Sequence, residues 1–190
     1  MINLLLDNIN KLVRSRIKIP FDTDFRISIL FEIMMQDTRY SMQVKTYKAL
    51  ELYYPETSQI KDVKKAIEDI IWFYSCGKNE EKTSQKADKD RKQIYSYIFD
   101  NDLIYSAFKD QYNIDLEEIG YLHWWKFKAM FNGLKTDARI VEIMGYRAMD
   151  LSKIKDKEMK KHYKELQQIY ALPDMRSEEE KENDFANELW

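Results

Sequence analysis

Turn-forming residues are scarce in this chain, and this scarcity limits the folds open to it. The 190 residues include only four glycines and three prolines. A fold built from β-strands alone needs turn residues roughly every 8 to 12 positions, so the chain has too few of them. The sequence therefore predicts a mainly α protein, a single compact helical domain with at most a small N-terminal β-hairpin or strand.

Apolar residues recur with helical spacing along most of the chain, and capping residues mark where helices begin and end. Asp22, Thr23 and Asp24 offer N-cap oxygens to a buried helix. Pro55 and Gly77 each follow the end of a further helix. These signals predict helices over residues 25–35, 41–54, 60–74, 102–112, 137–146 and 150–172.

Near the N-terminus, apolar and polar residues alternate with a period of two. From Val13 to Ile19, every second residue is apolar or small, and Arg14, Arg16 and Lys18 stand between them. Strict alternation is typical of a half-buried strand. We therefore expect a short strand here, which Pro20 ends.

The adjacent residues Trp124 and Trp125 lie in a stretch that is almost entirely apolar. A helical wheel drawn from Leu116 to Leu134 gives one core face, and Trp125 projects from the opposite side beside Tyr121 and Leu122. A helix that is apolar on two faces is either buried on both sides or docks a partner. Both alternatives stay open, and the second stripe is a candidate partner surface because Trp and Tyr are enriched at binding hot spots.

The last residues of the chain are rich in Glu and Asp and offer little to a core. We expect a helical domain over residues 1–173, a mobile polar loop at about 78–92, and a disordered acidic tail over 174–190. Phe185, Leu189 and Trp190 have the spacing of one amphipathic turn, which would dock in a groove. The alternative is a tail that serves only solubility.

The chain has few residues from which a catalytic or metal site could be built. His123 falls on the predicted core face, which favours a packing role, and His162 stands among lysines. Cys76 is the only cysteine, and one cysteine with two histidines cannot complete a Cys/His zinc site. We therefore expect a non-enzymatic protein with no catalytic residues, no cofactor and no metal.

The balance of charge favours neither nucleic acid nor membrane as a partner. The formal net charge is -2, and the lysines between Lys153 and Lys164 are interleaved with acidic residues, as on a solvated helix face. No apolar run approaches the roughly 18 residues of a membrane-spanning helix. A single cysteine fits a reducing cytoplasm.

Several strings occur in a specific order along the chain. The longer ones are Trp124-Trp125-Lys126-Phe127, Met144-Gly145-Tyr146-Arg147 and Leu151-Ser152-Lys153-Ile154-Lys155-Asp156-Lys157, and shorter ones lie at 23–26, 49–55, 71–77 and 104–108. In this combination, over roughly residues 12 to 173, the chain resembles a family of tail assembly chaperone-like proteins. These are encoded upstream of the tape-measure gene in phages and prophages of Gram-positive bacteria.

The resemblance implies a function without catalysis. It implies a chaperone that binds the phage tape-measure protein and assists tail-tube assembly, with the tail-tube protein and further copies of the chain as additional partners. The protein would act in the host bacterial cytoplasm during assembly and be absent from the mature virion. The alternatives are a structural tail component retained in the virion and a small nucleic-acid-binding regulator. The candidate partner-binding residues are Tyr121, Leu122, Trp125, Phe185, Leu189 and Trp190.

Overall fold

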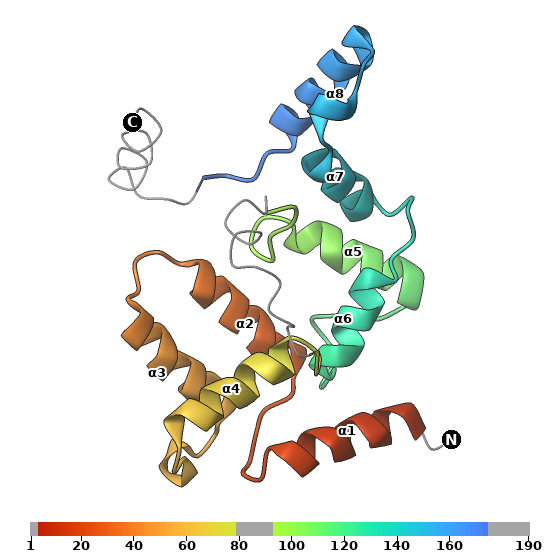
Figure 1. Cartoon of the computed structure of the whole chain (residues 1–190). Coiled ribbons are helices and arrows are strands. Elements are labelled where there is room, and N and C mark those ends of the chain that lie inside the picture. Colours follow the sequence, from red (N-terminus) through yellow and green to blue (C-terminus); the bar gives the residue numbers. More distant parts are fainter. Residues whose placement is uncertain (1–3, 79–92, 175–190) are drawn as a thin grey trace. The chain divides into compact units, whose positions relative to one another are not determined.

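The computed structural model describes residues 4–78 and 93–174 (Figure 1). Within these ranges the chain forms eight α-helices and two short 3₁₀ helices. Strand pairing in the same ranges is limited to one isolated antiparallel bridge, between Asp24 and His123. The prediction of a mainly α fold is therefore confirmed.

Side-chain caps mark the start of several helices. Asp24, Ser41 and Asp62 cap the second, third and fourth helices through side-chain oxygens that accept backbone N–H groups, which satisfies donors that a helix start leaves unpaired. The α-helices are α1 (Leu4–Arg16), α2 (Phe25–Gln36), α3 (Met42–Tyr53), α4 (Val63–Tyr74), α5 (Asn101–Tyr112), α6 (Trp124–Asn132), α7 (Arg139–Ala148) and α8 (Lys157–Ile169), and the 3₁₀ helices are η1 (Thr57–Gln59) and η2 (Leu151–Lys153).

The described residues group into two compact units. The first contains residues 4–78 and 121–127, and the second contains residues 93–120 and 128–174. The predicted single domain over 1–173 stays a prediction. The predicted polar loop at 78–92 and the acidic tail lie, apart from Lys78 and Asp174, outside the described residues.

The core of the first unit is built from aromatic side chains. The ring of Phe21 contacts those of Tyr53, Tyr54 and Phe73, each at a centroid distance of 5.1 Å. The hydroxyl of Tyr53 donates to Oγ of Ser28 at 2.9 Å, so the polar end of a fully buried tyrosine is satisfied. Burial raises the pKa of the Tyr53 hydroxyl, which therefore stays protonated.

The second unit contains a buried ion pair. The guanidinium of Arg147, on α7, donates to both carboxylate oxygens of Asp100, at 2.6 and 3.0 Å. It also donates to the backbone carbonyls of Ile94 and Tyr170. Both side chains are nearly inaccessible to solvent, so these contacts join the start of α5, α7 and the end of α8 in one network.

The predicted strand at 13–19 is wrong, because α1 continues to Arg16. Val13 and Ile17 are both buried, and the backbone N–H of Ile17 donates to the carbonyl of Val13 at 2.8 Å. Those two residues are four positions apart, so they lie on one side of a helix as readily as on one side of a strand. The sequence pattern was compatible with both, and the hydrogen bond between residues four positions apart shows that the helix forms.

Two predicted helices are shorter than expected. The central helix begins at Trp124 and not near Leu116, because residues 122–124 form backbone hydrogen bonds with residues 23–25. The last helix begins at Lys157 and not at Asp150, because the Asp156 carboxylate accepts the N–H of Met159 at 2.8 Å and caps a new start there.

Candidate functional site

A pocket with a volume of about 660 Å³ opens in the first unit. This volume lies in the range of roughly 300 to 1,000 Å³ that is usual for binding pockets. We call it the α1 pocket, because residues from the second half of α1 form one wall. Its lining residues are Asn10, Val13, Arg14, Ile17, Ile19, Pro20, Phe21, Asp22, Thr23, Pro55 and Tyr121.

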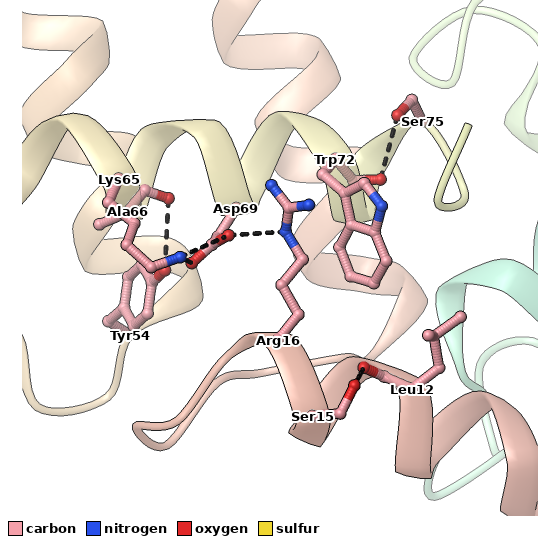
Figure 2. A network of polar contacts seen from close by, with 9 residues as sticks. All are labelled: Leu12, Ser15, Arg16, Tyr54, Lys65, Ala66, Asp69, Trp72 and Ser75. Atoms are coloured by element: carbon pink, nitrogen blue, oxygen red, sulfur yellow. Dashed lines mark hydrogen bonds and ion pairs between the residues drawn. The ribbon is translucent and has the colours of Figure 1, made fainter. Parts of the chain in front are cut away.

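Contacts with α4 hold the α1 wall in place, as Figure 2 shows. Nε of Arg16 donates to the carboxylate of Asp69 at 2.7 Å, and Nζ of Lys65 lies 3.1 Å from the same carboxylate. The guanidinium of Arg16 also lies over the ring of Trp72, at 4.7 Å from its centroid. The Asp69 side chain is only 5% exposed, so the two cations offset the cost of burying its charge.

The opposite side of the pocket is fixed by short polar contacts. The backbone N–H of Asp22 donates to the carbonyl of Tyr53 at 2.8 Å, and Oδ1 of Asp22 accepts the N–H of Asp24 at 2.9 Å. The hydroxyls of Thr23 and Tyr121 are hydrogen bonded at 2.6 Å. Tyr121 thus reaches the pocket from a segment almost 100 residues further along the chain.

Asp24 explains why Tyr121 lies there. One carboxylate oxygen caps α2 by accepting the N–H of Arg26, and the other accepts the N–H of Leu122 at 3.2 Å. The carbonyl of Leu122 accepts the N–H of Phe25, and the N–H of Trp124 donates to the carbonyl of Thr23, both at 2.9 Å. One carboxylate therefore starts a helix and also fixes the segment before α6.

The two adjacent tryptophans close the end of α4. Nε1 of Trp124 donates to the carbonyl of Tyr74 at 2.8 Å, and Nε1 of Trp125 donates to the carbonyl of Phe73 at 2.7 Å. The last carbonyls of a helix have no partner within the helix. The indole N–H groups supply these partners, so the tandem tryptophans join α6 to the end of α4.

The backbone after α4 turns in the left-handed region. Cys76 and Gly77 have φ values of 58° and 75°, and their N–H groups return to the carbonyls of Phe73 and Trp72. This pair of bonds is the Schellman arrangement that commonly ends helices. A Cβ built on Gly77 would lie 2.8 Å from the ring of Trp125, so glycine is required there for space as well as for conformation.

His123 is a structural residue at the start of α6. Its Nδ1 accepts the N–H of Trp125 at 3.1 Å, which is an N-cap contact. The side chain is buried, and no hydrogen-bond partner for Nε2 exists among the described residues. Burial lowers the pKa of His123 to about 4, so the imidazole is neutral at pH 7 and Nε2 carries its proton.

The other residues singled out for chemistry are not brought together. Cys76 is half-buried beside the end of α4, and His162 lies exposed on α8 next to Tyr163. Within residues 4–78 and 93–174, no group of three or more potential metal ligands occurs. No helix in those ranges is long and apolar enough to cross a bilayer.

The predicted partner-binding residues lie in different environments. Tyr121 is 53% exposed and lines the α1 pocket, whereas Leu122 is buried and Trp125 is half-buried against Phe73 and Trp72. Tyr121 and Leu122 precede α6, so the predicted stripe along one helix does not form. Phe185, Leu189 and Trp190 lie outside the described residues.

Sequence reasoning missed most of the α1 pocket. Eight of its eleven lining residues lie in the segment from Val13 to Thr23, and four of these eight belong to the stretch that was predicted to be a strand. A signal was nevertheless present, because Val13 and Ile17 have helical spacing and Pro20 and Phe21 add an apolar stretch directly after them. Only the contact of Tyr121 with Thr23 was beyond any local pattern.

The fold and the site define an all-helical protein with a pocket of mixed polar and apolar lining and an aromatic cluster at the end of one helix. The family model described as Bacteriophage Gp15 protein matches residues 9–172. This match covers most of the chain, so the protein belongs to the bacteriophage Gp15 family. No curated protein and no solved structure matches the chain.

Proposed function

We propose that this bacteriophage Gp15 family protein is a non-enzymatic tail assembly chaperone. It binds the tape-measure protein through the α1 pocket and assists assembly of the tail tube around it. The observation that carries the proposal is the exposed Tyr121 at a pocket of about 660 Å³ with both apolar and polar walls, in a chain that belongs to a phage family. The resemblance to proteins encoded beside the tape-measure gene supplies the partner.

The pocket has properties suited to a peptide partner. Ile19, Pro20 and Pro55 offer apolar surface, and the Tyr121 ring offers area together with a hydroxyl. Tyrosine of this kind contributes strongly to interfaces because it buries a large surface at low cost in side-chain entropy. The walls are held by hydrogen bonds and an ion pair before any partner arrives, and such preorganisation strengthens binding.

Co-expression with the tape-measure protein of the same phage tests the proposal. The wild-type chain is expected to co-purify with the tape-measure protein and to keep it out of the insoluble fraction. Tyr121→Ala should weaken this association by about thirtyfold, the effect of a hot-spot residue that contributes about 2 kcal/mol. Tyr121→Phe should retain most of it, because the ring remains.

The matched control is Tyr47→Ala. Tyr47 is 64% exposed on α3 and does not line the pocket, so its loss should leave the association unchanged. A wild-type chain that fails to bind the tape-measure protein refutes the proposed function. Detection of the protein in purified virions by mass spectrometry would instead support a structural tail component.

A further inference from the structure

We propose that the α1 pocket selects a peptide segment in which acidic side chains stand next to apolar ones. The inference deepens the proposed function and rests on it, because it names the chemistry of the tape-measure segment that would be bound. It is carried by the distribution of charge around the pocket.

Arg14 lines the pocket and is exposed. Within the part of the chain that the structure describes, Arg14 takes part in no ion pair, whereas its neighbour Arg16 is engaged by Asp69. A guanidinium presents five donors in a fixed fork that matches a carboxylate. The donors of Arg14 are therefore available to a group that enters the pocket.

On the α1 side of the pocket, from Asn10 to Ile19, the charged residues are all basic. Lys11 and Lys18 flank Arg14 in sequence and are exposed. Asp22 is the one acidic residue among those that line the pocket, and its Oδ1 already accepts the backbone N–H of Asp24. The α1 side of the pocket is thus cationic, and it complements an acidic partner.

The walls decide what kind of acidic partner fits. Ile19, Pro20 and Pro55 line the pocket, and each keeps apolar surface accessible. A phosphate group alone would gain nothing from these walls, whereas a leucine or phenylalanine side chain would bury apolar surface there. An apolar side chain in the pocket with a neighbouring carboxylate on Arg14 satisfies both features.

Two designed peptides test this inference. One carries leucine and phenylalanine on one side and glutamate on the other, and the second has lysine in place of every glutamate. Fluorescence anisotropy with the full-length protein should show the glutamate peptide binding at least about tenfold more tightly at low salt. The Arg14→Glu variant should reverse this preference, and Arg14→Gln should reduce it.

The control variant is Lys64→Glu, because Lys64 is exposed on α4 and does not line the pocket. It changes the net charge by the same amount as Arg14→Glu and should leave the preference intact. Equal binding of the two peptides, binding of neither, or displacement of the glutamate peptide by single-stranded DNA would overturn the inference. A wild-type chain that binds the tape-measure protein but does not distinguish the peptides refutes the inference alone.

Discussion

Replacing Gly77 with alanine should destabilise the protein for two separable reasons. The φ of Gly77 is +75°, and placing a residue with a Cβ in this region costs roughly 1 to 2 kcal/mol. The new Cβ would also lie 2.8 Å from Cη2 of Trp125, so the indole must shift. That shift costs about 1 kcal/mol, from an off-rotamer side chain or from a weaker bond to the carbonyl of Phe73. The free energy of unfolding should fall by about 2 to 3 kcal/mol in total.

Urea denaturation followed by circular dichroism measures this change, and a matched glycine provides the control. A Cβ on Gly145, inside α7, would meet no atom within 4 Å, so Gly145→Ala should stabilise that helix by about 0.5 to 1 kcal/mol. In a Trp125→Leu background, the cost of Gly77→Ala should drop to the conformational part alone. A Gly77→Ala protein as stable as the wild type would refute the reasoning.

Two further predictions concern buried polar groups. His123 has a pKa of about 4 in the folded chain, against 6.5 ordinarily, so the unfolded chain takes up a proton first as the pH falls. Above pH 6.5 the neutral His123 makes its full contribution to the free energy of unfolding. As the pH falls from 6.5 through about 4, the protein loses that contribution, about 3 kcal/mol. Parallel urea titrations should show a flatter decline for His123→Asn, which keeps a cap acceptor, and equal declines would contradict this. Arg147→Met leaves the carboxylate of Asp100 buried without its partner, which should cost about 3 to 5 kcal/mol. Adding Asp100→Asn should recover part of that loss, while Arg139→Gln, at an exposed pair on the same helix, should change thermal stability far less.

The sequence was informative where local chemistry decides the structure. Asp24 was among the predicted N-cap residues, and its cap is confirmed. A helix was predicted to begin at Ser41, and Ser41 is the residue that caps it. Pro55 was predicted to close the helix that ends at Tyr53. These features depend on residues within a few positions of one another, so periodicity and capping residues were enough to identify them.

Long-range contacts explain what the sequence could not reveal. The carboxylate of Asp24 accepts the N–H of Leu122, 98 positions away, and this contact holds residues 121–123 out of the predicted central helix. The tandem tryptophans were predicted to be a core or partner stripe, whereas their indoles satisfy carbonyls at the end of α4. Helical periodicity reports which residues are apolar, but it does not report which distant backbone groups need a donor.

The discontinuity of the first unit has a consequence for synthesis on the ribosome. This unit is completed by residues 121–127, so the chain up to Lys78 leaves the ribosome before Trp124 and Trp125 exist. At a usual rate of about 5 to 20 residues per second, the intervening segment takes roughly 2 to 9 s to synthesise. During that interval the carbonyls of Phe73 and Tyr74 lack the indole donors of Trp125 and Trp124, and the surface later covered by Trp124 is uncovered. The order of translation therefore leaves the first unit incomplete until Trp125 has been synthesised.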